Sequence, residues 1–288
     1  MTQVTYKTII YEVHDRAAVI TLNRPKQMNA WTNNMAIEVR HALATAEDDR
    51  NVFGIVITGG GNAFCAGSDV GELAQMSKAG GFVDGFEKEK VDLTADPGDP
   101  DMPEGYRKGG WAYFATIRKP VIAAVNGVVA GIGLPLILFC DMRFFAESGF
   151  VSAAFSKRGL VAEAGTAWIL PKLVGLDTAF DILWSSRKIF GPEAKELKLA
   201  TRVVKDENLV KDATDYINQL STSCSPNSIA AMKRQVYLDL FRDPTESFKE
   251  AHQLMKATLK SPDFKEGIKS FMEKRKPEFV GLGKDQSM

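Results

Sequence analysis

Cysteine and histidine are scarce in this chain, with three of each among 288 residues. The cysteines are odd in number and have no CxxC spacing, which argues against a disulfide framework and indicates a reducing compartment. No histidine lies near another histidine or near a cysteine in the sequence. Clusters with the usual metal-ligand spacing are therefore missing, and we predict no metal site.

An excess of charge of either sign is missing too, because 36 Lys and Arg balance 36 Asp and Glu. Global electrostatics therefore gives no support for a nucleic-acid or membrane partner, and we predict neither. Long hydrophobic runs are also lacking. The longest apolar stretch, residues 121–139, is interrupted by Asn126, three glycines and Pro135, which indicates a strand, a turn and a helix rather than a membrane span.

Targeting signals are not recognisable in the sequence. The first residues, MTQVTYKTII, have no basic region followed by an apolar run, so we expect no secretory signal. The last residues, GKDQSM, do not form a peroxisomal tripeptide. We therefore expect a cytoplasmic protein.

The composition that is present is typical of a globular protein, with 45% hydrophobic and 25% charged residues. Short β-rich runs alternate with turns and helical patterns, which predicts an α/β architecture. Residues 31–47 have apolar side chains at helical spacing, with Thr32 as the expected N-cap. Strands are predicted at 17–23, 53–61, 119–127, 141–147 and 150–155, and a buried helix at 133–142.

Two parts of the chain differ in character from this core, which we assign to residues 1–195. An insertion at about 74–110 is rich in glycine, proline and charge, and it is either a lid or pocket wall or a solvated loop. Residues 196–288 have amphipathic helical patterns separated by proline and aspartate. Their apolar faces need a partner, either the core or another subunit.

Two glycine-rich turns each follow a predicted strand, in GGGNAFCAGSDV (59–70) and in NGVVAGIGLPL (126–136). Small residues leave the backbone N–H groups of such turns open to an anionic oxygen. Neither segment has the spacing of a phosphate loop. Taken singly, each is more often a packing turn, but two N–H donors that converge on one point would form an oxyanion hole.

A single carboxylate, Glu163, lies in the otherwise apolar and small-residue stretch GLVAEAGTAWILPKLVG (159–175). A buried charge is costly unless it is paired or functional. Desolvation would raise the pKa of this carboxyl and make it a better general base near neutral pH. The alternative is an ordinary structural carboxylate on an exposed loop.

Five segments, taken together, resemble the crotonase superfamily, also called the enoyl-CoA hydratase/isomerase family. The resemblance implies a superhelix of stacked ββα units, followed by helices that form a trimer or a dimer of trimers. It also implies a coenzyme A thioester as substrate, with no further cofactor. The segments are ITLNRPKQMNAW (20–31), VITGGGNAFCAGSDVGEL (56–73), KPVIAAVNGVVAGIGLPLILFCDMRFFAE (119–147), FSKRGLVAEAGTAWILPKLVG (155–175) and DFKEGIKSFMEKRKPEF (263–279).

The resemblance also implies roles for individual residues. The backbone N–H groups of Ser68 and Ile132 would form the oxyanion hole for an enolate on the thioester oxygen. Ile132 stands where family members usually have glycine, but a backbone donor requires no particular side chain. Lys26 and Lys274 match positions that contact the phosphates of coenzyme A, although any single lysine is more often merely solvated. The remaining predicted substrate contacts are Met28, Ala66, Asp69 and Val70.

The departures from the family pattern bear on the reaction. Hydratases of the family use two glutamates, and this sequence has Pro135 and Phe155 at those positions. Glu163 falls instead where double-bond isomerases of the family often have their single acid, and where related dehalogenases have a nucleophilic Asp. The resemblance therefore predicts an enzyme that shifts a 3-enoyl-CoA double bond to the 2-position, with Glu163 as the proton shuttle.

Two other readings stay open at this point. One is a hydratase, or another family reaction such as thioester hydrolysis, that takes a second acid from Glu72, Asp84 or Glu87. The other is a catalytically silent acyl-CoA-binding protein. Pocket walls are expected from the insertion and from aromatic residues such as Trp111, Phe114, Phe155 and Trp168, for which a place in the core is the default.

Overall fold

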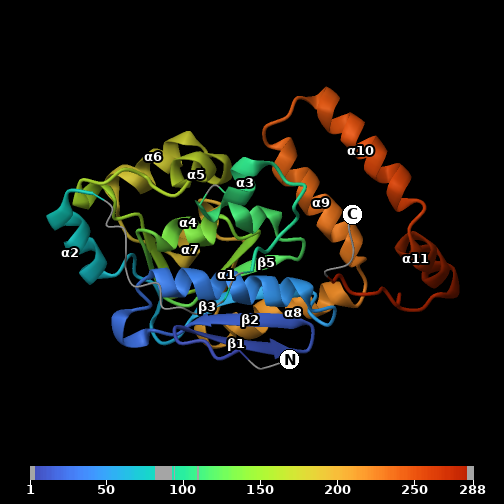
Figure 1. Ribbon diagram of the computed structural model, residues 1–288, viewed down its shortest axis with the longest axis horizontal. Helices are drawn as coiled ribbons and strands as arrows, with labels where there is room; N and C mark the ends of the chain where they lie inside the picture. The colour runs from blue at the N-terminus through green and yellow to red at the C-terminus, as the bar shows by residue number, and fades with distance from the viewer. Residues whose placement is uncertain (1–3, 82–92, 94, 109, 284–288) are drawn as a thin grey trace.

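The computed structural model describes residues 4–81, 93, 95–108 and 110–283, and it has the α/β architecture predicted from the sequence (Figure 1). Two sheets form its centre, and their neighbouring strands are parallel except at the β1–β2 and β8–β9 edges. The first sheet has the order β1 (Ile9–His14), β2 (Ala17–Leu22), β3 (Gly54–Gly59), β5 (Val121–Val125), β7 (Met142–Ala146) and β10 (Arg202–Val204). The second has the order β4 (Ala63–Cys65), β6 (Val128–Ala130), β8 (Phe150–Ser152) and β9 (Ile189–Phe190).

The chain passes from the first sheet to the second through tight corners at β3–β4, β5–β6 and β7–β8. Glycine is required at these corners because the backbones approach closely. A Cβ on Gly59 would lie 2.1 Å from the Ala63 carbonyl oxygen, and one on Gly127 would lie 2.2 Å from that of Asn62. Repetition of this corner stacks the ββα units, and the expected crotonase-like superhelix is confirmed.

The remaining elements are helices that cover or extend the sheets. They are α1 (Asn33–Asp48), α2 (Val70–Ala79), α3 (Glu104–Lys108), α4 (Gly133–Leu138), α5 (Thr166–Val174), α6 (Leu176–Ser185), α7 (Gly191–Glu196), α8 (Leu209–Ser221), α9 (Pro226–Asp239), α10 (Pro244–Thr258) and α11 (Pro262–Glu273). Short 3-10 helices are η1 (Pro25–Gln27), η2 (Gly110–Thr116), η3 (Ser156–Arg158) and η4 (Asp206–Asn208). As predicted, the Thr32 side chain caps α1 by accepting a hydrogen bond from the Met35 N–H.

Two of the predicted elements extend clearly beyond the observed ones. The helix expected over 133–142 ends at Leu138, because the chain must turn there to enter β7. Asp141 fixes this turn by accepting hydrogen bonds from the Val121 N–H at 2.7 Å and the Lys233 ammonium at 2.7 Å. The strand expected over 150–155 ends at Ser152, and Ala154 already has a positive φ of 61°.

The inner strands β2, β3, β5 and β7 of the first sheet are buried, because their side chains alternate between two covered faces. On β2, Ala18 and Ile20 belong to the same buried cluster as Val39 and Leu43 of α1. On the opposite face, β2 contributes Ala17 and Val19 to a smaller cluster that includes α8, through Leu209, Ala213 and Ile217. Burial on both faces explains why these strands read as nearly continuous apolar runs.

The C-terminal helices α10 and α11 extend away from the sheets (Figure 1). We call residues 244–273 the arm. Helix α10 has no buried residue, and Phe248 on it is 73% exposed. Met255 of the same helix and Leu259, its C-cap residue, are exposed as well. A helix gains most of its stability from packing an apolar face, and the described residues of this chain leave these apolar side chains of the arm uncovered.

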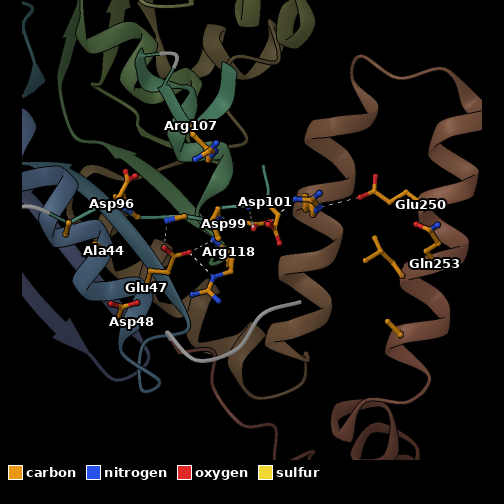
Figure 2. Close-up of a pocket in the computed structure, with 17 residues that line it drawn as sticks. Ala44, Glu47, Asp48, Asp96, Asp99, Asp101, Arg107, Arg118, Glu250 and Gln253 are labelled. Carbon is orange, nitrogen blue, oxygen red and sulfur yellow. Dashed lines mark hydrogen bonds and ion pairs between the residues drawn. The ribbon is translucent and has the colours of Figure 1, made fainter. Parts of the chain in front are cut away.

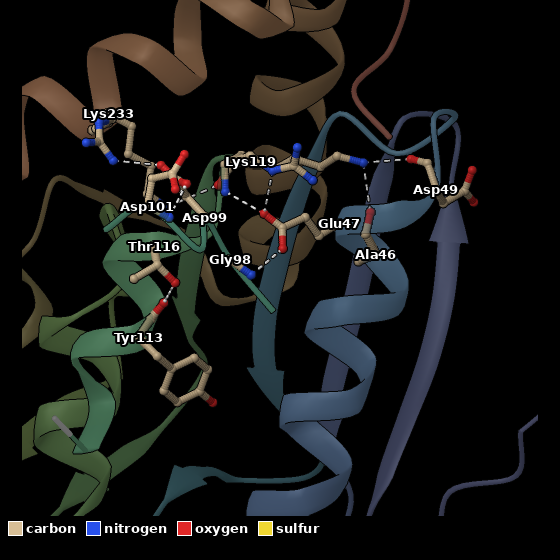
Figure 3. A network of polar contacts seen from close by, with 12 residues as sticks. Ala46, Glu47, Asp49, Gly98, Asp99, Asp101, Tyr113, Thr116, Lys119 and Lys233 are labelled. Atoms are coloured by element: carbon tan, nitrogen blue, oxygen red, sulfur yellow. Dashed lines mark hydrogen bonds and ion pairs between the residues drawn. The ribbon is translucent and has the colours of Figure 1, made fainter. Parts of the chain in front are cut away.

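A buried polar network fastens the end of α1 to the segment that leads into β5 (Figure 3). The Glu47 carboxylate accepts hydrogen bonds from the Gly98 N–H at 2.5 Å and the Arg118 N–H at 2.8 Å. Lys119 is 1% exposed, and its ammonium donates to the carbonyl oxygens of Ala46 at 2.9 Å and Asp49 at 2.6 Å. The ammonium thus supplements the hydrogen bonds at the C-terminal end of α1, where helix carbonyls lack intrahelical donors.

Among the residues that the structure describes, none of the helices combines the length and apolar character needed to cross a membrane. The predicted cytoplasmic location stays a prediction. The same holds for the boundaries of the 1–195 core, the 74–110 insertion and the 196–288 region.

Lys119 gives a prediction about stability. Burial lowers the pKa of its ammonium from 10.5 to about 8, because the interior disfavours the charged form. The folded protein holds this proton less tightly than the unfolded chain does. The resulting stability cost is present below the folded pKa and disappears as the pH rises toward the unfolded pKa.

We therefore expect the unfolding free energy of the wild type, relative to that of Lys119→Met, to increase by about 2 kcal/mol between roughly pH 7 and pH 10. Urea denaturation of both proteins at several pH values measures this difference. A difference that stays flat would show that the buried ammonium keeps its ordinary proton affinity, and one that decreases with pH would show that the fold binds the proton more tightly; either would contradict the lowered pKa.

Candidate active site

The two glycine-rich turns singled out in the sequence lie side by side, because each follows one of two neighbouring parallel strands. β4 pairs with β6, and the turns at Gly67 and Gly131 follow the carboxyl ends of these strands. Both glycines have positive φ, 116° and 48°. A Cβ added to Gly131 would lie 3.6 Å from the Gly67 Cα, so the two turns touch. The next residues are Ser68 and Ile132, the two predicted oxyanion-hole donors.

The Ser68 amide is left free by the way its neighbours bond. Trp31 and Ser68 form a parallel bridge in which the Trp31 N–H donates to the Gly67 oxygen at 2.8 Å and the Asp69 N–H donates to the Trp31 oxygen at 3.1 Å. In a parallel bridge, the polar groups of the middle residue point away from the partner strand. None of the residues that the structure describes accepts a hydrogen bond from the Ser68 N–H.

The Ile132 amide is free for a related reason. Ile132 is the N-cap of α4, and the first amides of a helix have no intrahelical acceptor. Within the described part of the chain, no acceptor lies in hydrogen-bond range of this N–H. The following Gly133 packs directly on β4, where a Cβ would lie 2.5 Å from the Cys65 oxygen. This contact holds the start of α4 against the strand that leads to Ser68.

Glu163 lies on a strained turn between η3 and α5. The Thr166 N–H donates to the Glu163 oxygen at 2.9 Å across this turn. Ala164 and Gly165, between them, have φ values of 52° and 81°. A Cβ on Gly165 would lie 2.9 Å from the Phe139 Cζ, so the turn is pressed against the end of α4. A non-glycine residue with positive φ is costly and persists where surrounding contacts fix the backbone.

The Glu163 side chain is half-buried and makes no ion pair or hydrogen bond with any residue in the described ranges. Burial is the sole cause that raises the pKa of its carboxyl above the ordinary 4.5. An unpaired, partly desolvated carboxylate that is not satisfied by its own protein is a candidate for proton transfer.

The structure has no acidic side chain at the two positions where hydratases of the family have their glutamates. Pro135 is buried inside α4 and Phe155 is buried at the start of η3. Of the three acids considered as replacements, Glu72 lies in the first turn of α2, where burial and the nearby Asp69 carboxylate raise its pKa. Asp84 and Glu87 lie outside the described residues.

Most of the other predicted substrate contacts gather around the Ser68 turn. Met28 is exposed, and its carbonyl oxygen accepts from the Ala66 N–H at 3.1 Å. Lys26 is exposed in η1, directly before it. Asp69 caps α2 through a 2.9 Å hydrogen bond from the Gly71 N–H, and Val70 is 77% exposed.

Lys274 is the exception, because it is not brought to this turn. It follows α11 on the arm and has a positive φ of 55°. Helix α2, which begins beside Ser68, and helix α11 lie at opposite ends of the molecule (Figure 1). Lys274 therefore does not lie beside the Lys26 turn of its own chain.

Three of the four aromatic residues considered as pocket walls belong to the core, since Trp111, Phe114 and Phe155 are buried. Trp168 differs. It is 37% exposed, and its ring stacks between Phe139, at a centroid distance of 6.0 Å, and Phe241, at 4.6 Å. This aromatic column connects α4, α5 and the end of α9.

The sequence reasoning missed the residues that hold the Ser68 turn, namely Arg24, Asn29 and Trp31. Arg24 bonds to both Ala30 and Asp69. All three lie in the segment ITLNRPKQMNAW, so the signal was present as a motif. Its function depends on partners about 40 positions away along the chain, which a linear pattern does not reveal.

A cleft of about 860 Å³ lies elsewhere, between the end of α1, residues 95–101 and the helices α9 and α10 (Figure 2). Its charged side chains largely satisfy one another. Arg234 binds Asp99 at 2.8 Å and Glu250 at 3.3 Å, which ties the base of the arm to the body. Glu163, Ser68 and Ile132 are not among its lining residues. No group of three or more potential metal ligands occurs in the part of the chain that the structure describes.

Comparison with known proteins agrees with this geometry. A family described as enoyl-CoA hydratase/isomerase matches residues 12–282. The 1,2-epoxyphenylacetyl-CoA isomerase of Escherichia coli is 29% identical over 283 residues, covering 95% of this chain and 98% of the relative. The mitochondrial enoyl-CoA hydratase of Pongo abelii is 30% identical over 267 residues, covering 92% and 84%.

Solved structures agree as well. The enoyl-CoA hydratase of Mycobacterium tuberculosis superposes with a TM-score of 0.80 at 26% identity, covering 95% of this chain and 99% of that one. The enoyl-CoA hydratase of Bacillus anthracis superposes with a TM-score of 0.78 at 26% identity, covering 96% and 100%. The sequence match, the fold and the paired glycine turns lead to one conclusion: this chain belongs to the enoyl-CoA hydratase/isomerase family.

Proposed function

We propose that the protein is an isomerase that converts a 3-enoyl-CoA thioester into the 2-enoyl isomer. The observation that carries this proposal is the set of acids. Glu163 is unpaired, half-buried and beside α4, whereas Pro135 and Phe155 occupy the positions of the two hydratase glutamates. A double-bond shift needs one proton shuttle, while hydration also needs a positioned water.

The chemistry follows from these groups. The thioester oxygen accepts hydrogen bonds from the Ser68 and Ile132 N–H groups. The Glu163 carboxylate takes a proton from C2, and the electron pair moves into a dienolate that extends from the oxygen to C4. The protonated Glu163 then returns the proton to C4, which leaves the double bond between C2 and C3. Fixed backbone dipoles stabilise the negative charge as it develops on the oxygen.

The proposed reaction is balanced without a further reactant, because the proton removed is the proton returned. Coenzyme A enters as part of the substrate. We therefore propose that no metal and no resident cofactor takes part. Lys26 would bind the coenzyme A phosphates, and Met28, Ala66, Asp69 and Val70 would line the path from the phosphates to the oxyanion hole.

Hydration of a 2-enoyl-CoA is the second candidate, and Glu72 is the observation that favours it. Its carboxyl lies within one helical turn of Ser68 and has a raised pKa. Such a group could activate a water molecule together with Glu163. Glu72→Gln separates the two candidates, since it abolishes hydration but leaves the proposed isomerisation intact.

Glu163→Gln tests the role of the proposed base. We expect isomerisation to fall by about 10²- to 10⁴-fold, because the amide cannot accept the C2 proton. Affinity for a saturated acyl-CoA and the melting temperature should stay near the wild-type values. Glu207→Gln, at an exposed position in η4, is the matched control. Full activity in Glu163→Gln would exclude this carboxylate as the base.

The pH dependence of the rate gives a separate prediction. The base must be ionised, and the pKa of Glu163 is raised above 4.5 by burial. The value of kcat/KM should therefore decrease as the pH falls through that raised pKa, at a higher pH than for an exposed glutamate. A pH profile measured from about pH 4 to pH 8 would show this acidic limb. An unchanged rate across that range would contradict the assignment.

We also propose that the chain forms a homotrimer or a dimer of trimers through its arm. Helix α10 has no buried residue, and Phe248, Met255 and the C-cap residue Leu259 are exposed. Burial of this apolar face against a neighbouring chain removes it from water. The same contact would bring Lys274 of one chain toward the Lys26 turn of another.

The role of the arm in assembly can be tested by measuring the mass of the protein in solution. Light scattering should give three or six times the chain mass for the wild type, and smaller species for Phe248→Glu combined with Met255→Glu. Lys249→Glu, at an exposed polar position of the same helix, is the control and should leave the assembly intact. A monomeric wild type would overturn the proposal.

Co-expression of two variants tests whether Lys274 acts on a neighbouring chain. Glu163→Gln alone should be nearly inactive, and Lys274→Ala alone should have a raised KM. Mixed assemblies contain sites with Glu163 from one chain and Lys274 from the other. A component with the wild-type KM should therefore appear, and its absence would place Lys274 in its own chain's site or in no site.

A further inference from the structure

The direction of the Ser68 N–H cannot be fixed by a hydrogen bond that this N–H donates within the protein, since it must stay free for the substrate. It is fixed instead by the residues on either side. Gly67 and Asp69 both bond to Trp31, at 2.8 Å and 3.1 Å. The direction of the Ser68 N–H therefore depends on how firmly the segment around Trp31 and the segment around Ser68 are held together.

The Arg24 guanidinium forms hydrogen bonds to both of these segments. Its Nη1 donates to the Ala30 carbonyl oxygen at 2.6 Å, and its Nη2 donates to the Asp69 Oδ2 at 3.0 Å. Ala30 precedes Trp31, and Asp69 follows Ser68. The guanidinium thus spans the Trp31–Ser68 bridge from outside. The Arg24 and Asp69 side chains are only 22% and 25% exposed, so solvent competes weakly for these bonds.

Asn29 holds the backbone of Arg24 in turn. The Arg24 N–H donates to the Asn29 Oδ1 at 2.8 Å, while the Asn29 Nδ2 donates to the carbonyl oxygens of Gly60 at 2.9 Å and Ala63 at 2.7 Å. Asn29 is fully buried and has a positive φ of 54°. Arg24 is therefore anchored to the start of β4, the strand that leads into the Ser68 turn.

We infer that Arg24 is a positioning residue that sets the direction of the Ser68 N–H in the oxyanion hole; this rests on the proposed function of that site. Arg24 also lies two residues before Lys26. The turn that would bind the coenzyme A phosphates and the donor that would bind the thioester oxygen are therefore attached to the same guanidinium.

Lysine cannot replace arginine in this role. The guanidinium offers two nitrogens at a fixed spacing, which here point at two acceptors on two segments. An ammonium has the same charge but a single nitrogen in place of the planar fork, so it does not reproduce the two separately directed bonds that Nη1 and Nη2 make to Ala30 and Asp69. Arg24→Lys therefore keeps the charge of the site and weakens the link between the segments.

Infrared spectroscopy of a bound acyl-CoA reports on the link directly. The probe is saturated butyryl-CoA with ¹³C at the thioester carbonyl, whose stretching frequency falls when N–H groups donate to the oxygen. We expect a clear shift to lower frequency in the wild type and loss of much of this shift in Arg24→Lys. The kcat for isomerisation should fall by about 10- to 100-fold, with the affinity for coenzyme A changed by less than about threefold.

Arg187→Lys is the matched control. Arg187 also bridges two carboxylates, Asp181 at 2.8 Å and Glu193 at 2.7 Å, but on the surface of α6 and α7. This variant should leave the shift and kcat at wild-type values. If Arg24→Lys does not fold, Asp69→Asn takes its place, since it keeps an acceptor for the Gly71 N–H and weakens the bond to Arg24.

The outcomes separate this inference from the function on which it rests. A wild type without any carbonyl shift would overturn the oxyanion hole, and with it the proposed function. A wild-type shift that is equally large in Arg24→Lys, or in Asp69→Asn, would overturn the role of Arg24 alone. Loss of the shift in the variant, with the control unchanged, supports the inference.

Discussion

Two adjacent parallel strands that end in glycine turns impose the constraint on which the site depends. Because β4 and β6 are hydrogen-bonded neighbours, their turns meet, and the amides of Ser68 and Ile132 are left without acceptors among the described residues. Ser68 and Ile132 are both partly exposed, so these donors are open to a ligand. We propose that a substrate oxygen accepts from both, so that the same corner that stacks the ββα units also creates the binding site.

The position of Glu163 is likewise set by the backbone around it. A strained turn, with Ala164 at positive φ and Gly165 against Phe139, puts a carboxylate in a partly desolvated place where nothing in the described chain pairs with it. Strain and an unpaired charge both reduce stability, and they occur together where function requires them. Two free donors and one free base are the groups that enolate chemistry needs.

Part of the fold and of the site could be predicted, because it depends on residues that are close together in the sequence. The Thr32 cap, the apolar strands and the two glycine turns follow from the residues themselves, and the isolated acid at Glu163 was visible for the same reason. The exit from α4 at Leu138 was not predicted, because it depends on hydrogen bonds from Val121 and Lys233 to Asp141.

Features that depend on residues far apart in the sequence were harder to predict. The role of Arg24 requires Ala30 and Asp69 to lie on either side of it in space. The amphipathic pattern of α10 correctly indicated a helix with a face to cover. The pattern could not show that the described residues leave this face uncovered, or that Lys274, directly after α11, lies far from the Ser68 turn.

The central claim is that one carboxylate and two backbone donors carry out a double-bond shift. It is tested most directly by following the ultraviolet band of a conjugated 2-enoyl thioester in two parallel reactions of the purified protein. With a 3-enoyl-CoA the band should appear. With a 2-enoyl-CoA it should persist, because the proposed reaction uses Glu163 alone and activates no water. Loss of the band in the second reaction, without gain in the first, would contradict the account and identify a hydratase.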